Sequence, residues 1–225
     1  MTPGRASLEA LAHHGVVPVL TVERPSHAVD AAAALRAGGL AVVEITLRTA
    51  AGLPAIGEVV ASFPDMVVGA GTVLDVEAAA AAVEAGARFV ASPVFDDVVV
   101  AWCRTREVLV LPGVTTPNEM MRARRAGLDV VKLFPAATAG GPAVLRAVSA
   151  VFDGLRYVPT GGIRAADLED YSAIPSVVAC GGSWMVDPSL LAARDWAAVE
   201  ELSREAVEAV RRARARRAGD PDAGP

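Results

Sequence analysis

The sequence predicts a single-domain (β/α)₈ barrel with an additional helix before the first strand. Eight short runs rich in β-branched residues alternate with alanine-rich stretches of helical length. This alternation is typical of a parallel sheet with right-handed crossovers, and eight units close a barrel for which 225 residues suffice. An open doubly wound sheet is the alternative, but its glycine-rich phosphate loop is missing from the first connection, residues 21–26.

Each predicted strand is short, apolar and followed by a helical stretch. The strands are expected at residues 16–22, 41–47, 66–73, 89–94, 108–114, 130–135, 157–160 and 177–181. The helices are expected near residues 26–38, 53–62, 75–85, 96–106, 117–126, 142–149, 165–171 and 189–215. The additional helix, residues 7–14, is expected to cap the N-terminal end of the barrel. One domain over residues 1–217 and a disordered tail over residues 218–225 complete the predicted organisation.

Composition excludes several classes of protein. The chain is 53% hydrophobic and 21% charged, as expected for a globular protein, and its net charge of −5 argues against nucleic-acid binding. Residues 211–217 form a basic run that is read as a solvated helix end. No uncharged apolar run is long enough for a membrane span, and residues 1–9 lack a signal-peptide pattern, so we expect a cytoplasmic protein.

Lys132 is the one lysine among 21 basic residues, and it lies in an apolar run expected to form a buried strand. A desolvated lysine amine can lose its proton and form an imine, whereas a guanidinium stays protonated and delocalised. Lys132 is therefore a candidate nucleophile. The alternative is that arginine-rich coding left one lysine by chance.

The second strand carries polar residues at alternate positions. Glu44, Thr46 and Arg48 share one face, while the apolar residues between them must meet the surrounding helices. The polar set is therefore expected to point into the barrel, where charges are costly unless paired or used. A structural ion pair between Glu44 and Arg48 is the alternative, although the two backbone positions lie about 13 Å apart.

Further polar and aromatic residues end neighbouring strands. Phe134 shares a face with Lys132, Thr72 ends the third strand and Thr160 ends the seventh. Together with Glu44 and Arg48, these groups suit a small keto acid: the guanidinium and hydroxyls bind its carboxylate, the amine attacks its ketone and the glutamate moves protons. The two cysteines have neither disulfide nor metal spacing, and no metal or other cofactor is expected.

Two glycine pairs follow the last two predicted strands, Gly161-Gly162 and Gly181-Gly182, the second followed by Ser183. In phosphate-binding barrels, backbone amides in these two loops hold the phosphate. The sequence therefore predicts a phosphate site there. Tight turns without a ligand are the alternative.

At this point the chain resembles the 2-keto-3-deoxy-6-phosphogluconate (KDPG) / 4-hydroxy-2-oxoglutarate (KHG) aldolases over about residues 10–210. The resemblance rests on Glu44-x-Thr46-x-Arg48, Gly69-Ala70-Gly71-Thr72, Lys132-x-Phe134-Pro135, Pro159-Thr160-Gly161-Gly162 and Gly181-Gly182-Ser183-Trp184. It implies a metal-independent class I aldolase on a (β/α)₈ barrel, commonly a homotrimer. The implied substrate yields pyruvate and a phosphorylated aldehyde.

The resemblance also implies a role for each matching residue. Lys132 corresponds to the Schiff-base lysine and Glu44 to the general acid/base. The residues that correspond to substrate or phosphate contacts are Arg48, Thr72, Thr160, Pro93, Phe134, Gly161, Gly162, Gly181, Gly182 and Ser183.

One residue departs from the pattern, because Val94 stands where many members have glycine, and it is expected to narrow the pocket mouth. Three alternatives stay open at this point. They are an aldolase for 2-keto-3-deoxy-6-phosphogalactonate, a phosphosugar isomerase and a non-catalytic phosphosugar-binding barrel.

Overall fold

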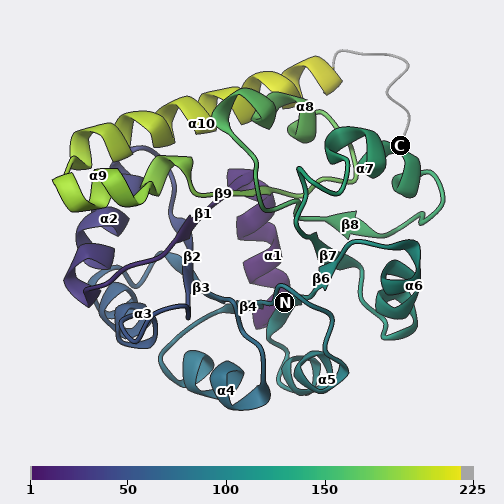
Figure 1. The fold of residues 1–225 in the computed structure, drawn as a ribbon, viewed down its shortest axis with the longest axis horizontal. Helices are drawn as coiled ribbons and strands as arrows, with labels where there is room; N and C mark the ends of the chain where they lie inside the picture. Colours follow the sequence, from purple (N-terminus) through teal and green to yellow (C-terminus); the bar gives the residue numbers. More distant parts are fainter. Residues whose placement is uncertain (1, 219–225) are drawn as a thin grey trace.

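The computed structural model describes residues 2–218, which form an α/β fold with parallel strands (Figure 1). The strands are β1 (Val16–Leu20), β2 (Val42–Thr46), β3 (Val67–Gly71), β4 (Phe89–Ala91), β5 (Leu109–Leu111), β6 (Gly113–Val114), β7 (Val130–Leu133), β8 (Arg156–Tyr157) and β9 (Cys180–Gly182). They form a six-stranded sheet of order β5-β4-β3-β2-β1-β9 and a three-stranded sheet of order β6-β7-β8. This confirms the predicted alternation and the parallel sheet.

Helices follow the strands in sequence and lie around them in Figure 1. They are α1 (Pro3–His14), α2 (Pro25–Ala37), α3 (Gly52–Ser62), α4 (Val76–Glu84), α5 (Asp97–Thr105), α6 (Pro117–Arg125), α7 (Gly141–Ser149), α8 (Leu168–Ser172), α9 (Pro188–Ala193) and α10 (Trp196–Ala218), with short 3₁₀ turns at η1 (Ala165–Asp167) and η2 (Trp184–Val186).

Contacts join the two sheets at both edges. Pro112 alone separates β5 from β6, and its carbonyl accepts a hydrogen bond of 2.9 Å from the Lys132 backbone N–H. At the other edge, a parallel bridge pairs Thr160 with Gly181. The edge strands of the two sheets are therefore in contact with each other. The strands expected at residues 108–114 and 157–160 are present, but they are shorter and interrupted.

The first helix lies in the middle of the ring of strands in Figure 1. It begins at Pro3, four residues earlier than expected, because the Thr2 side chain caps it by accepting from the Arg5 N–H. Leu8 and Leu11 pack among inward-facing strand residues such as Phe89. Burial of these side chains holds α1 beneath the strands.

Alternation along β2 divides its side chains between two environments. Val43 and Ile45 are fully buried in the core between strands and helices, whereas Val42 belongs to the inner cluster with α1. Glu44 and Thr46 share the side of Val42 and are also buried. The predicted inward direction of the polar face is confirmed for these two residues.

The expected last helix, residues 189–215, is two helices, and that expectation was wrong. Arg194 has a φ of 53°, in the left-handed region, and ends α9. The Asp195 side chain then accepts from the Ala198 N–H and starts α10. Ala218, placed in the expected tail, is the last residue of α10, and residues 219–225 lie outside the described part of the chain.

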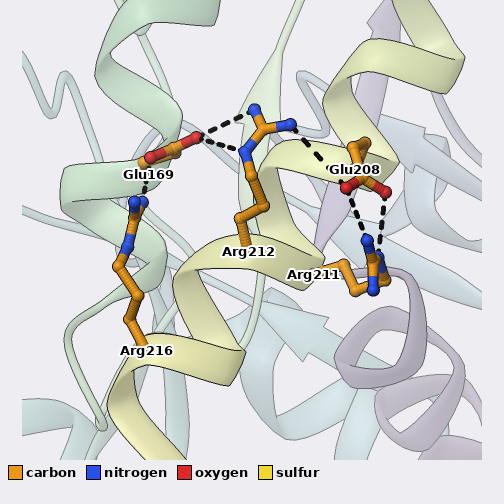
Figure 2. Close-up of polar contacts among 5 residues, drawn as sticks. All are labelled: Glu169, Glu208, Arg211, Arg212 and Arg216. Atoms are coloured by element: carbon orange, nitrogen blue, oxygen red, sulfur yellow. Dashed lines mark hydrogen bonds and ion pairs between the residues drawn. The ribbon is translucent and has the colours of Figure 1, made fainter.

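Three arginines of the basic run at the end of α10, Arg211, Arg212 and Arg216, are exposed and form ion pairs. Figure 2 shows Glu169 of α8 between Arg212 and Arg216, and Glu208 beside Arg211. These contacts attach the end of α10 to α8. Within residues 2–218, no helix combines the length and apolar character that a membrane span requires.

Candidate active site

A cavity of about 300 Å³ opens at the carboxyl ends of the strands, where barrel enzymes bind their substrates. It collects most of the polar residues singled out in the sequence. Its lining consists of Val19, Thr21, Glu44, Arg48, Lys132, Phe134, Thr160, Gly161, Gly162, Ile163, Gly181, Gly182, Ser183, Val186 and Pro188.

Lys132 of β7 and Glu44 of β2 meet in this cavity although 88 residues separate them. Lys132 Nζ donates to Glu44 Oε1 at 2.9 Å and to Oε2 at 3.3 Å. The two residues are only 5% and 3% exposed. Because Glu44 pairs with Lys132, the alternative of a structural pair with Arg48 is wrong. The pair joins an amine to a carboxylate that can exchange a proton with it.

Glycine at position 71 makes room for this pair. A Cβ atom there would lie 2.3 Å from Glu44 Oε1, closer than any packing permits. The small residues at the end of β3, noted in the sequence, therefore leave space for the carboxylate.

Arg48 extends from the end of β2 and lines the cavity. Its Nε donates to Thr72 Oγ1 at 3.3 Å, so the β2 and β3 ends are linked above Glu44. Thr72 itself is not among the lining residues, and it has a φ of 60°, which is rare for a non-glycine residue. The guanidinium and hydroxyl form a cationic corner suited to a carboxylate.

Phe134 lies directly after β7, and Thr160 lies in the segment after β8. The Phe134 ring centroid is 5.7 Å from Lys132 Nζ, and the Phe134 carbonyl accepts a 2.6 Å hydrogen bond from Thr115 Oγ1. Thr160 is buried, and its hydroxyl donates to the Val158 carbonyl at 3.3 Å. An aromatic ring thus lies close to the amine, and a buried hydroxyl lines the same cavity.

Two glycine loops form the adjoining side of the cavity. Gly161 and Gly162 have φ values of 99° and 76°, conformations that residues with a Cβ rarely adopt. Within the described chain, the backbone N–H groups of Gly161, Gly162 and Ser183 donate to no protein acceptor. Backbone amides of glycine-rich loops that have no protein acceptor are candidate anion-binding groups.

Comparison with known proteins identifies the family of this chain. The model of the family "KDPG and KHG aldolase" matches residues 8–202. The chain belongs to this aldolase family.

Individual relatives agree with the family match. A 2-dehydro-3-deoxy-phosphogluconate aldolase of Pseudomonas aeruginosa is 47% identical over 193 residues, 86% of this chain and 88% of that protein. A KHG/KDPG aldolase of Escherichia coli is 40% identical, covering 91% of this chain and 96% of that protein. The KDPG aldolase of Legionella pneumophila, whose structure captured pyruvate as a covalent carbinolamine, matches with a TM-score of 0.85 and 36% identity, covering 88% of this chain and 96% of that chain.

Besides Thr72, two further residues of this aldolase that were expected at the pocket are not part of its lining. Pro93 is half-buried after β4, and Val94 is 49% exposed beside it. Neither is among the residues that form the cavity wall. The expectation that Val94 narrows the mouth therefore gains no support from the lining.

Sequence reasoning missed several residues that the aldolase places in the cavity. Thr21 is the most polar of them, and the others are Val19, Ile163, Val186 and Pro188. The missed signal for Thr21 was strand parity, because Val17, Val19 and Thr21 alternate along β1 as Glu44 and Thr46 do along β2.

The two cysteine thiols of the aldolase are buried and stay protonated at neutral pH. Burial raises the pKa of the Cys103 thiol to about 11 and that of Cys180 to about 12. Among the described residues, no three His, Cys, Asp or Glu side chains are grouped as metal ligands would be.

Proposed function

We propose that this aldolase cleaves KDPG to pyruvate and glyceraldehyde 3-phosphate through a Schiff base, and 4-hydroxy-2-oxoglutarate to pyruvate and glyoxylate. The observation that carries the proposal is the buried contact of 2.9 Å between Lys132 Nζ and Glu44 Oε1. A buried amine beside a carboxylate has the two groups that imine chemistry needs, a nucleophile and a proton carrier.

The reaction begins with transfer of a proton from Lys132 to Glu44. The neutral amine attacks the C2 ketone, and Glu44 returns its proton to the departing hydroxyl, so that loss of water gives a protonated imine that withdraws electrons from C3. Glu44, now a carboxylate, accepts the proton of the C4 hydroxyl as the C3–C4 bond breaks and the aldehyde leaves. Glu44 then gives this proton to C3 of the enamine, and addition of water to the imine releases pyruvate and restores the amine.

Arg48 and Thr72 bind the keto-acid carboxylate in this proposal. The guanidinium supplies charge-assisted hydrogen bonds, and its contact with Thr72 Oγ1 fixes its direction. Phe134 forms one wall, and Pro93 is assigned to the wall by family resemblance alone. Thr160 is assigned an influence on the configuration at C4 by family resemblance, and its buried hydroxyl supports this assignment because Thr160 and Lys132 both line the cavity.

The phosphate binds at the two glycine loops. The amides of Gly161, Gly162 and Ser183 support this assignment, since they lack protein acceptors in the described chain and their residues line the cavity together with Gly181 and Gly182. The phosphorylated aldehyde half therefore extends away from Arg48, toward the ends of β8 and β9.

The remaining organisation is part of the same proposal. We infer one closed (β/α)₈ domain over residues 1–217, supported by the paired edges of the two sheets, with α1 closing its N-terminal end. Family resemblance supports a cytoplasmic homotrimer that requires neither a metal nor another cofactor.

Borohydride trapping with pyruvate tests this function directly. One lysine in the sequence means that only Lys132 and the N-terminal amine can react, so peptide mapping assigns the adduct. We expect a stable pyruvyl adduct on the Lys132 peptide and turnover of KDPG that EDTA does not inhibit. Folded protein that forms no adduct would contradict the proposal and favour an isomerase or a binding protein.

Turnover of the two C4 epimers then separates the remaining alternative. We expect faster cleavage of KDPG than of its phosphogalactonate counterpart. The reverse preference would assign this chain to the other sugar acid while leaving the imine chemistry unchanged.

A further inference from the structure

A pair of hydroxyl groups lies in the cavity beside the groups used so far. Thr21 Oγ1 and Thr46 Oγ1 are 2.7 Å apart, one after β1 and one at the end of β2. Thr46 is fully buried, whereas Thr21 is half-buried and lines the cavity. Nothing in the imine mechanism uses either hydroxyl.

We propose that Thr21 donates a hydrogen bond to the hydroxyl group of the aldehyde half of the substrate, and that Thr46 orients Thr21 for this contact. The proposal rests on the aldolase function proposed above. It assigns a specificity contact for a hydroxylated aldehyde, separate from the carboxylate and phosphate sites.

Hydrogen-bond satisfaction fixes the direction of the pair. A threonine hydroxyl carries one donor and two acceptor sites, and a buried donor without an acceptor is costly. Within residues 2–218, Thr21 Oγ1 is the sole partner of the buried Thr46 hydroxyl. Thr46 therefore donates to Thr21, and the proton of Thr21 is left to point into the cavity.

The backbone around this pair is held in place. Parallel pairing sets Val19 opposite Glu44, which brings the two threonines to the same level two residues further on. Just beyond them, Thr49 Oγ1 donates to the Val22 carbonyl at 2.6 Å and links the same two loops. Strand pairing before Thr21 and the Thr49 hydrogen bond after it therefore fix the backbone that carries the Thr21 hydroxyl.

The position of β1 in the sheet indicates which substrate atom Thr21 reaches. On one side β1 pairs with β2, which carries Glu44 and leads to Arg48. On the other side it pairs with β9, where Pro18 is opposite Gly182 of the phosphate loop. Thr21 thus lies between the ends assigned to carboxylate and phosphate. On the aldehyde side of the cleaved bond the substrate carries two hydroxyl groups between those ends. The C4 hydroxyl gives its proton to Glu44 in the proposed mechanism, so the hydroxyl left for Thr21 is the one at C5, next to the phosphorylated carbon.

The test measures condensation of pyruvate with two aldehydes that differ by one hydroxyl group, glyceraldehyde 3-phosphate and its 2-deoxy analogue, 3-oxopropyl phosphate. For Thr21→Val we expect kcat/KM to fall by about 2–10-fold with glyceraldehyde 3-phosphate, the value of one neutral hydrogen bond. The deoxy aldehyde should react as it does with wild type. Thr21→Ser keeps the donor and should retain the wild-type preference.

Thr46→Val tests the orienting role without removing the proposed contact. We expect a smaller loss with glyceraldehyde 3-phosphate and none with the deoxy aldehyde, because Thr21 then donates without a fixed direction. Thr46→Ser should restore the preference. A merely structural role of Thr46 would change both aldehydes equally.

Two results would overturn the proposal. One is equal loss with both aldehydes in Thr21→Val, and the other is no loss with either. Borohydride trapping of pyruvate is measured on the wild-type protein and on every variant. A wild-type protein that forms no adduct would contradict the aldolase function itself. Either of the two results above, obtained with a wild-type protein that forms the adduct, would contradict only the role of Thr21.

Discussion

The ion pairs of this protein fall into two regions with opposite physical character. In the cavity, the Lys132 and Glu44 side chains are 6% and 4% exposed and, among residues 2–218, have only each other as charged partners within hydrogen-bonding distance. On the α8–α10 surface, Arg216 and Glu169 are 65% and 31% exposed and belong to a network of five residues (Figure 2). The surface network contains more contacts, yet each exposed pair adds little stability.

The difference shows that burial decides what an ion pair can do. Water screens the surface pairs, so removing one partner leaves a charge that solvent stabilises. The cavity pair lacks that solvation, so removing one partner leaves a buried charge, which is strongly unfavourable.

Replacing Lys132 is expected to produce the largest effect. Lys132→Arg keeps a cation opposite Glu44 but cannot form an imine, so turnover should fall below detection while the protein stays folded. Steady-state cleavage of KDPG and borohydride trapping with pyruvate measure the two consequences. Near-normal turnover in this variant would contradict the mechanism.

Lys132→Met is the matched variant for stability. It removes the same chemistry but leaves Glu44 buried without its cation, a loss typically worth about 3–5 kcal/mol for buried pairs. We therefore expect it to melt at a lower temperature than Lys132→Arg. Equal melting temperatures would show that solvent in the cavity stabilises Glu44 as it does a surface carboxylate.

Glu44→Gln should come next in magnitude. The amide cannot accept or return a proton, so turnover should fall by about 10²–10⁴-fold, the usual contribution of a general acid or base. Lys132 remains, so a pyruvate adduct should still be trapped, more slowly than in wild type. Wild-type rates would remove Glu44 from proton transfer.

Arg48→Ala sharpens the comparison, because Arg48 belongs to the cavity but is exposed. Loss of its hydrogen bonds to the substrate carboxylate should raise KM by about 10–100-fold, as expected for a charge-assisted contact, with little change in melting temperature. Saturation curves with KDPG provide the measurement. An unchanged KM would exclude Arg48 from the carboxylate site.

The sequence predicted the buried region better than its connections. Alternation along β2 and β7 was enough to direct Glu44 and Lys132 inward, because strand parity is a local property. Their direct pairing depends on the closure of the sheets across 88 residues, and no local pattern encodes that distance. Arg48 was for the same reason considered as a partner of Glu44.

Thr21 and the α9–α10 break were missed for different reasons. Thr21 was inside the predicted strand, residues 16–22, but parity was not applied to it, because the alternate residues of this strand are apolar up to Val19 and nothing else marks an inward polar face. The break at Arg194 uses a left-handed arginine, whereas glycine is the usual signal for such an end. A capping aspartate was present at position 195, but the apolar pattern on both sides favoured one continuous helix.

Glu169→Gln should produce the smallest effect and completes the comparison. Hydrogen bonds from Arg216, and then from Arg212, hold the pKa of the Glu169 carboxyl below its ordinary value of 4.5. A lowered pKa in the folded state stabilises the protein above about pH 4.5, and this stabilisation is lost as pH falls through the folded-state value. At neutral pH and low salt we therefore expect a slightly lower melting temperature than wild type. The difference should vanish in acid and in about 1 M salt.

Glu205→Gln is the control for Glu169→Gln, because Glu205 is an exposed carboxylate of α10 without an ion pair to the described residues. It should melt like wild type at every pH and salt concentration, and both variants should cleave KDPG at the wild-type rate. A loss of stability in Glu169→Gln as large as that of Lys132→Met would show that the α8–α10 network acts as a buried pair does. Burial would then no longer explain the difference between the two regions.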